Sequence, residues 1–188
     1  MICGLDEAGR GPLAGPVCAA AAVLPGNFPR NILGDSKKLS EKQREAARAL
    51  IMDRALAWGI AFATHEEIDD INILRASLLA MKRAFEAMLA AFPGLDRSGL
   101  EAIADGLYVP DITIPCKAIV KADGLIPEVM AASILAKTAR DREMDRYARL
   151  YPQYGYEKHK GYPTKAHREA ILRWGPSPIQ RLKFRIKG

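Results

Sequence analysis

The stretch Leu5-Asp6-Glu7-Ala8-Gly9-Arg10-Gly11-Pro12 decides how the rest of this chain is interpreted. The apolar run at residues 2–5 stops at two acids and then enters glycines, which predicts a strand that opens into a tight loop. Carboxylates suit a hard cation, and glycines let the backbone approach a ligand closely. The Arg10 guanidinium adds a planar set of donors that suits phosphate. The stretch therefore indicates metal-assisted phosphoryl chemistry.

Two other interpretations of this stretch have to be weighed. An Asp-Glu pair at the end of a strand is often just a solvated turn. Gly9, Gly11 and Ala14 also fit a loose G-x-G-x-x-A dinucleotide pattern. However, Pro12 and Pro16 interrupt the segment that should open the helix. The carboxylates of Asp6 and Glu7 would also place negative charge beside the negatively charged pyrophosphate. The sequence therefore disfavours dinucleotide binding.

Length and composition favour one domain, or one domain with a small appendage, in a cytoplasmic protein. The chain has 188 residues, 49% of them apolar, which is enough for a sizeable core. Its apolar runs are too short or too interrupted by charge to span a membrane, and its start lacks the pattern of a secretory signal. Cys3, Cys18 and Cys116 form no C-x-x-C pair, which is typical of reduced thiols in a cytoplasmic protein. We expect a monomer without a membrane partner.

The basic charge of the chain is concentrated near its end. The net charge is +6, and between residues 158 and 187 the only acid is Glu169 among many lysines and arginines. A basic segment on a folded domain suggests a polyanionic partner, most often nucleic acid. An ordinary charged surface would look the same, so charge alone does not identify the partner.

Hydrophobic patterning predicts an α/β domain. Strands are expected at residues 2–5, 17–24 and 58–64 and in two short runs near 100–104 and 112–120, although the alanines of 17–24 also permit a helix there. Helices are expected from the capping box at Ser40 and Gln43, at 72–91, at 127–150 and at 165–173, with an acidic turn or short helix at 65–70. These elements describe a mixed sheet of about five strands flanked by helices, in which the early strands are close enough to pair antiparallel.

Three of the predicted strands lead into acidic residues. The acids Asp6 and Glu7 follow the first strand, and Asp105 and Asp123 each lie in an Ala-Asp-Gly tripeptide after a later apolar run. Ligands of open α/β sheets gather at strand ends, and carboxylates held close together need a cation. Mg²⁺ prefers such oxygen ligands, and two ions can assist cleavage of a phosphodiester. Adjacent strand residues point to opposite faces, so Asp6 and Glu7 share a site only if the strand ends or twists between them.

Six stretches of the chain form a distinctive series: DEAGRGP at 6–12, DSKKL at 35–39, NIL at 72–74, ADG at 104–106, SILAK at 133–137 and HKGYPT at 159–164. In this order and spacing they resemble bacterial ribonuclease HII from end to end. The resemblance implies a ribonuclease H-like fold, with a catalytic domain at 1–150. It assigns 151–188 to a small, basic, tyrosine-bearing helical extension packed on the same domain. It also implies an endonuclease that cuts the RNA strand of RNA–DNA hybrids. Single ribonucleotides in duplex DNA would be cut on their 5′ side, leaving a 3′-hydroxyl and a 5′-phosphate.

The resemblance also implies roles for individual residues. It assigns catalysis and binding of two Mg²⁺ or Mn²⁺ ions to four acids, namely Asp6, Glu7, Asp105 and Asp123. The segment Gly9-Arg10-Gly11 would sense the 2′-hydroxyl that separates RNA from DNA, and Tyr162 would stack on the neighbouring sugar.

Basic and hydroxyl residues are candidates for phosphate contacts. Ser133, Lys137 and Arg140 are spaced to share one face of a helix, and that face could grip phosphates beside the metal ions. For Arg140 a solvated helix face is an equal alternative. Lys37 and Lys38 would contact other phosphates.

The end of the chain departs from the family pattern. Lys183 precedes Phe184 where the family often has a small hydroxyl residue. Gln180-Arg181-Leu182-Lys183-Phe184 also resembles, loosely, the Q-x-L-x-F peptides that dock on bacterial sliding clamps. A terminal segment packed on its own domain is the alternative.

Two further function classes stay open at this point. One is a protein that binds hybrid or duplex nucleic acid without chemistry, which would bind in a salt-sensitive manner but would need neither metal nor the four acids. The other is ribonuclease HIII, which usually carries an extra N-terminal domain. The position of Met1 directly before the first strand favours the HII type.

Overall fold

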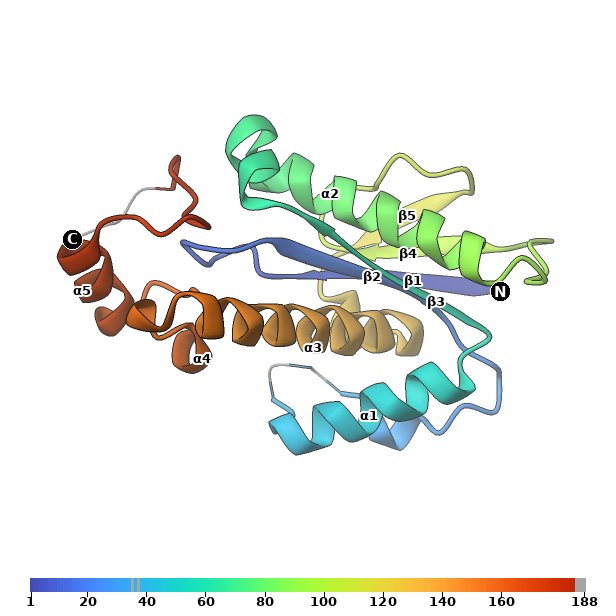
Figure 1. The fold of residues 1–188 in the computed structure, drawn as a ribbon. Helices are drawn as coiled ribbons and strands as arrows, with labels where there is room; N and C mark the ends of the chain where they lie inside the picture. The colour runs from blue at the N-terminus through green and yellow to red at the C-terminus, as the bar shows by residue number, and fades with distance from the viewer. Residues whose placement is uncertain (35, 37, 185–188) are drawn as a thin grey trace.

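A five-stranded mixed sheet forms the centre of the molecule. The structure is a computed structural model that describes residues 1–34, 36 and 38–184. The strands are β1 (Ile2–Ala8), β2 (Val17–Val23), β3 (Ala57–Ala63), β4 (Glu101–Asp105) and β5 (Cys116–Ile119). Their order in the sheet is β3-β2-β1-β4-β5. In Figure 1 the sheet lies between helix α2 on one face and helices α1 and α3 on the other.

Strand β1 is the central strand and sets the register on both sides. It pairs antiparallel with β2 and parallel with β4, and β2 pairs antiparallel with β3. The predicted mixed sheet, with antiparallel pairing of the early strands, is therefore confirmed. Strands β1 and β4 are parallel, and Leu5 is the partner of Ala104. The residues that follow this pair, Asp6 and Asp105, therefore lie on adjacent strands toward the same edge of the sheet.

The helices cover both faces of this sheet. Their bounds are α1 (Glu41–Arg54), α2 (His65–Ala91), α3 (Pro127–Leu150), α4 (Tyr156–His159) and α5 (Lys165–Trp174), with short 3₁₀ turns η1 (Arg30–Ile32), η2 (Ala122–Gly124) and η3 (Pro152–Tyr154). One apolar cluster lies between the sheet and α2, and a second lies between the sheet and α1 and α3. Every residue of β2 is buried, as expected for a strand covered on both faces. None of the helices in the described residues is long and apolar enough to cross a membrane.

Side-chain caps explain where the helices begin. The Ser40 hydroxyl accepts the amide of Gln43, and the Gln43 side chain accepts the amide of Ser40, which is the predicted capping box. Helix α2 contains a break at Asn72, whose φ is 69° and whose Oδ1 accepts the amides of Leu74 and Arg75. Asn72 therefore caps the second part of α2, and the sequence prediction of a short element before a long helix is confirmed.

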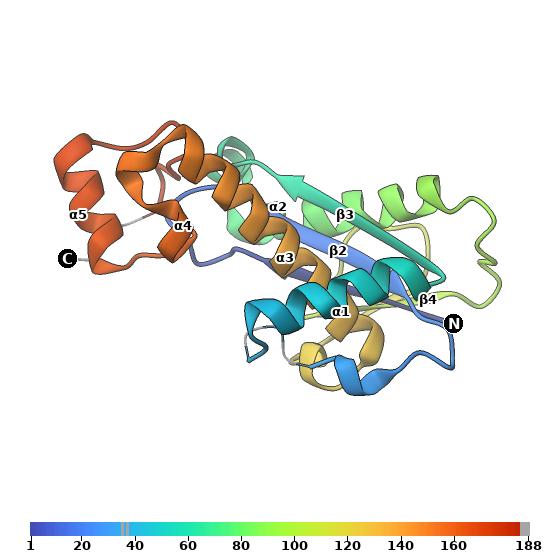
Figure 2. The same cartoon turned by 60° about the horizontal axis from the view of Figure 1, so that its bottom comes forward.

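The last part of the chain packs against one end of α3. Figure 2 shows α4 and α5 gathered at that end. A third apolar cluster joins this region to the rest, and its members are Ala14, Met144, Ala148, Tyr154, Tyr156 and Ile179. Ala14 also forms a β-bridge with Gln180, so the end of the chain lies against the loop that follows β1.

Candidate functional site

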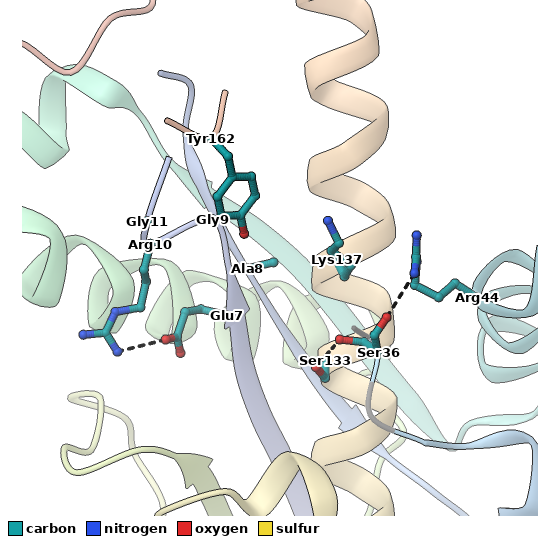
Figure 3. Close-up of a pocket in the computed structure, with 10 residues that line it drawn as sticks. All are labelled: Glu7, Ala8, Gly9, Arg10, Gly11, Ser36, Arg44, Ser133, Lys137 and Tyr162. Atoms are coloured by element: carbon teal, nitrogen blue, oxygen red, sulfur yellow. Dashed lines mark hydrogen bonds and ion pairs between the residues drawn. The ribbon is translucent and has the colours of Figure 1, made fainter. Parts of the chain in front are cut away.

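A cavity lies at the end of β1, where the glycine-rich segment 9–11 leaves the sheet. Its volume is about 480 Å³, and it is lined by Glu7, Ala8, Gly9, Arg10, Gly11, Ser36, Arg44, Ser133, Lys137 and Tyr162. Figure 3 shows Glu7 and Arg10 on one side of this space and Ser36, Ser133, Lys137 and Arg44 on the other. The structure thus brings together residues from β1, the β1–β2 loop, α1, α3 and the segment after α4.

Asp6 is a buried acid at the base of this region. Its exposed fraction is 4%. Its Oδ1 accepts the amide of Glu7 at 2.7 Å, so the carboxylate folds back along its own strand. Burial, then the neighbouring Glu7 and Asp105 carboxylates, raises the pKa of Asp6 well above its usual range, while a hydrogen bond from Ser133 acts the other way. Asp6 therefore interacts with both Glu7 and Asp105, although β1 continues to Ala8.

Asp105 connects β4 to the turn that carries Asp123. Its Oδ1 accepts the amide of Ala122 at 2.7 Å, and Asp123 is the next residue along the chain, in the half-buried turn η2. The hydrogen bond holds this turn beside the end of β4. The backbone positions of the four acids thus form a continuous group: Asp6 and Glu7 on β1, Asp105 on the adjacent strand, and Asp123 on the turn tied to Asp105.

The chemistry of this group fits a hard divalent cation. The donors are carboxylate oxygens, which Mg²⁺ and Mn²⁺ accept as ligands. The two charged neighbours with the largest effect on Asp6 are both acidic, so a cation would relieve their repulsion. Among the described residues, no three acidic, histidine or cysteine side chains are already gathered as closely as a bound ion would hold them. The group provides the right ligand type, while its closed ligand geometry is not formed in this structure.

The glycine-rich loop after β1 is fixed by two buried arginines. Arg181 donates all five of its guanidinium hydrogens to carbonyls of this loop, and Arg140 donates to the carbonyls of Ala14, Pro16 and Lys160. Gly9 has a φ of 99°, and a Cβ built on it would lie 1.9 Å from the Arg140 Nε. The loop is therefore packed so closely against Arg140 that position 9 has no room for a side chain.

Tyr162 closes the cavity opposite Gly11. A Cβ built on Gly11 would lie 3.6 Å from the Tyr162 ring, which is ordinary contact distance. Tyr162 is 40% exposed, and its carbonyl accepts a hydrogen bond from the His167 Nδ1 at 3.0 Å. The Gly161 carbonyl accepts the amide of Leu13 at 2.8 Å, which ties the tyrosine segment to the loop after β1. An exposed aromatic ring beside a glycine-rich backbone suits contact with a sugar or base.

Two buried histidines support the tyrosine segment. The rings of His159 and His167 are stacked with their centroids 4.5 Å apart. The His159 Nδ1 accepts the amide of Gly161, so its Nε2 donates to the Tyr154 carbonyl at 2.9 Å. Burial lowers the pKa of both histidines. Their hydrogen bonds to the backbone at residues 154, 161 and 162 hold the tyrosine segment in place.

The predicted phosphate contacts have different outcomes. Ser133 and Lys137 line the cavity, but each also has a partner in the protein: Ser133 Oγ lies 2.9 Å from Ser36 Oγ, and Lys137 Nζ lies 2.8 Å from Asp141 Oδ1. Lys38 is exposed, and Lys37 lies outside the described residues. Arg10 donates to Glu7 Oε1 at 3.1 Å and keeps about half of its side chain exposed.

The interpretation of Arg140 as a phosphate contact or a solvated surface residue was wrong. Its exposed fraction is 1%, and its donors are occupied by backbone carbonyls. The helical spacing with Ser133 and Lys137 was correct, but the loop after β1 covers the helix at Arg140. Sequence spacing could not show this, because Pro16 and Ala14 are more than a hundred residues away.

Three further residues were missed by sequence reasoning. Arg44, in the first turns of α1, lines the cavity and donates to the carbonyls of Ser36 and Leu39, which holds the segment before α1. Ser36 lies within the stretch 35–39 that the sequence singled out for its resemblance, and Arg44 follows the predicted cap at Ser40. For Arg181 there was no comparable signal, since its partners are backbone carbonyls at the other end of the chain.

The chain is similar to known ribonucleases over nearly its whole length. The ribonuclease HII family model matches residues 3–187. A ribonuclease HII of Treponema denticola is 56% identical over 196 aligned positions, covering 100% of this chain and 99% of that protein.

Solved structures show the same fold. The ribonuclease HII of Archaeoglobus fulgidus, solved as a complex with PCNA, is similar with a TM-score of 0.75 at 24% identity, covering 100% of this chain and 96% of that one. Bst-RNase HIII in complex with Mn²⁺ is similar with a TM-score of 0.77 at 19% identity, covering 97% of this chain and 66% of that one. The fold is thus ribonuclease H-like, as the sequence predicted. With the match over nearly its whole length, the chain belongs to the ribonuclease HII family of metal-dependent endoribonucleases.

Proposed function

We propose that this chain cuts the RNA strand of RNA–DNA hybrids and also cuts on the 5′ side of single ribonucleotides embedded in duplex DNA. Ribonuclease H activity follows from the family, and the proposal concerns the finer specificity. The observation that carries it is the composition of one cavity. Glu7 at the acidic strand end, the Gly9–Gly11 backbone and the Tyr162 ring all line the same space.

This arrangement would recognise the junction between RNA and DNA through its sugar. The 2′-hydroxyl separates RNA from DNA, and a glycine-rich backbone can donate hydrogen bonds to it at close range. Tyr162 lines the same cavity as Gly11 and would pack against the neighbouring sugar. Lys137, on the α3 side of the cavity, would place positive charge beside the phosphate.

The four acids would hold two divalent ions, Mg²⁺ or Mn²⁺. Asp6, Glu7, Asp105 and Asp123 supply oxygen ligands from adjacent positions, and a Mn²⁺ complex is known for the similar Bst-RNase HIII. When bound, such ions supply the Lewis acidity that phosphodiester hydrolysis needs. The protein contributes the placement: Ser133 hydrogen-bonds to Asp6, and Asp105 is fixed by the amide of Ala122. The products would be a 3′-hydroxyl and a 5′-phosphate.

The partners of the chain would be nucleic acids, and we propose that it acts as a monomer in the cytoplasm. The A. fulgidus enzyme was solved with PCNA, so clamp binding by Gln180–Phe184 has to be considered. In this chain Gln180 is buried and bridges to Ala14, and Phe184 packs against the core and against the Arg181 guanidinium. This packing supports the alternative in which the segment belongs to its own domain.

The test is cleavage of an end-labelled duplex that contains one ribonucleotide, with and without Mg²⁺. We expect one cut, on the 5′ side of the ribonucleotide, that requires Mg²⁺. The control is the same duplex made entirely of DNA, which should stay intact. Cleavage of both duplexes would contradict the sugar specificity. Tight binding without any cleavage would instead favour the nucleic-acid-binding alternative.

A further inference from the structure

Arg181 is a fully buried arginine, and all its N–H groups donate hydrogen bonds to the loop after β1. Its exposed fraction is 0%. An arginine has five N–H donors, and each has a carbonyl partner in the loop after β1. Nε donates to Gly15 at 2.8 Å, Nη1 to Arg10 at 3.0 Å and Pro12 at 2.8 Å, and Nη2 to Gly9 at 2.7 Å and Pro16 at 3.2 Å. The guanidinium is thus the centre around which residues 9–16 are wrapped.

Its charge is not paired with a carboxylate in the manner of an ion pair. Burial lowers the pKa of Arg181 to about 9, with the nearby Arg140 acting in the same direction. No salt bridge joins Arg181 to an acidic side chain within the described parts of the chain. Burying a charge in this way is costly. The surrounding carbonyls therefore stabilise the buried guanidinium. The guanidinium in turn fixes the directions of these carbonyls.

The direction of two carbonyls determines the direction of two amides. In a trans peptide unit the C=O and the following N–H point to opposite sides, and the described residues contain no cis peptide bond. Because the Gly9 and Arg10 carbonyls point at Arg181, the N–H groups of Arg10 and Gly11 point away from it. Neither amide donates to another group in the described residues. Both residues line the cavity, so these amides are available to a ligand oxygen.

The two buried arginines, Arg140 and Arg181, hold different parts of the structure. Arg140 contacts the carbonyls of Ala14 and Pro16 and also that of Lys160, so it joins the loop to the segment that carries Tyr162. Of the two, Arg181 is the one that contacts the carbonyls of Gly9 and Arg10.

The position of Arg181 itself is fixed by its neighbours along the chain. Its amide donates to the Leu13 carbonyl, and the next two amides, of Leu182 and Lys183, donate to the carboxylate of Asp69. The last turn of the described chain is thereby anchored to α2. A residue distant in sequence from the loop can then act on it as a rigid support.

We propose that Arg181 is a positioning residue for ribonucleotide recognition. By fixing the carbonyls of Gly9 and Arg10, it holds the amides of Arg10 and Gly11 in the direction needed to donate to the 2′-hydroxyl oxygen of the substrate. The inference rests on the proposed function of the cavity. It adds that the discrimination between a ribose and a deoxyribose depends on a side chain from the end of the chain.

The test variant is Arg181→Lys, which keeps a positive charge but cannot span five carbonyls. Two quantities are measured: kcat/KM on a duplex with one ribonucleotide, and Kd for the same duplex made of DNA. We expect kcat/KM to fall by about 100-fold, the size of effect that a small misplacement far from the chemistry can produce. Kd for the DNA duplex should stay close to the value of the unmodified protein, because phosphate contacts dominate that binding.

Two controls separate positioning from a general loss of structure. Arg173→Lys changes an exposed arginine of α5 and should leave both quantities unchanged. Met88→Ala removes a core side chain remote from the cavity and should lower thermal stability without a selective loss on the ribonucleotide substrate. If Arg181→Lys does not fold, Asp69→Ala loosens the same turn while keeping the guanidinium. Asp69→Ala should then lower kcat/KM on the ribonucleotide substrate by about tenfold, as a partial misplacement of the same loop.

The results distinguish the inference from the proposed function. If the unmodified protein cuts at the ribonucleotide and Arg181→Lys behaves like Arg173→Lys, the inference is wrong while the function stands. An equal loss in cleavage and in binding of the DNA duplex would also overturn it, since that pattern indicates a structural role only. If the unmodified protein does not cut at the ribonucleotide, the proposed function fails and the inference fails with it.

Discussion

Gly9→Ala should destabilise this protein far more than Gly11→Ala, although the two glycines are only two residues apart. Gly9 has a φ of 99°, whereas Gly11 is not among the residues with positive φ. A Cβ at position 9 would lie 1.9 Å from the Arg140 Nε and 2.3 Å from its Cδ. Arg140 is 1% exposed and donates to three carbonyls, so it cannot move aside without breaking these bonds.

The size of the effect follows from these contacts. A left-handed backbone costs a non-glycine residue about 1–2 kcal/mol. Each buried donor left without a partner costs about 1–3 kcal/mol. If Arg140 loses one or two of its bonds, Gly9→Ala should lower the free energy of unfolding by about 3–5 kcal/mol. In a domain of this size that corresponds to a fall in Tm of roughly 10 °C.

Gly11→Ala is the matched control. Its new methyl group would lie 3.6 Å from the Tyr162 ring, which is ordinary contact, so its stability should stay within about 0.5 kcal/mol of the unmodified protein. Its cleavage of a ribonucleotide-containing duplex should nevertheless fall, because the methyl group enters the cavity. Urea unfolding followed by circular dichroism measures the first effect, and a cleavage assay measures the second. Equal stability of the two variants would refute the packing argument for Arg140.

Three further predictions concern catalysis and pH. Asp105→Asn should abolish cleavage while largely sparing binding of the hybrid, because the amide oxygen can still accept from Ala122; full activity in the cleavage assay would remove Asp105 from the metal site. Tyr162→Ala should reduce cleavage at a single ribonucleotide more than cleavage of a long hybrid, and equal losses on the two substrates would count against stacking on the junction sugar. Because the folded-state pKa of His159 and of His167 lies below the ordinary value of about 6.5, the unfolded chain takes up protons first as the pH falls. In Asp6→Asn, which removes the opposite contribution of the buried Asp6 carboxyl, stability should therefore fall as the pH drops below about 6.5 until the folded-state pKa values of the histidines are reached, and a Tm that rises between pH 7 and pH 5.5 in that variant would contradict this.

The sequence predicted the fold well where periodicity and caps are local properties. The capping box at Ser40 and Gln43 placed the start of α1 correctly, and the break before the long part of α2 was anticipated at Asn72. The short elements η3 and α4 were not predicted, because four residues or fewer are too short to show a period. The predicted run at 112–120 contributes only Cys116–Ile119 to the sheet.

The site was predictable in its parts but not in its supports. Asp105 could be placed at a strand end from the sequence, whereas Asp6 lies within β1, because its pairing with β2 carries the strand past the predicted end at residue 5 to Ala8. The parallel pairing of β1 with β4 brings Asp6 and Asp105 to adjacent strands. The Asp6 carboxylate accepts the amide of Glu7 while β1 continues to Ala8, so a site shared by the Asp6 and Glu7 carboxylates stays a prediction. The structural roles of Arg140 and Arg181 could not be predicted, because their partners are backbone carbonyls. Every residue has a backbone carbonyl, so the sequence does not show which of them an arginine will contact.

The central claim is that four acids remote along the chain hold a pair of divalent ions against a sugar–phosphate backbone. The most direct measurement is a crystal structure with Mn²⁺ and a ribonucleotide-containing duplex, in which anomalous scattering locates the ions. We expect two ions bound by carboxylate oxygens of Asp6, Glu7, Asp105 and Asp123, beside the phosphate on the 5′ side of the ribonucleotide. Ions bound by other side chains, or an Asp123 carboxylate directed away from them, would contradict the claim.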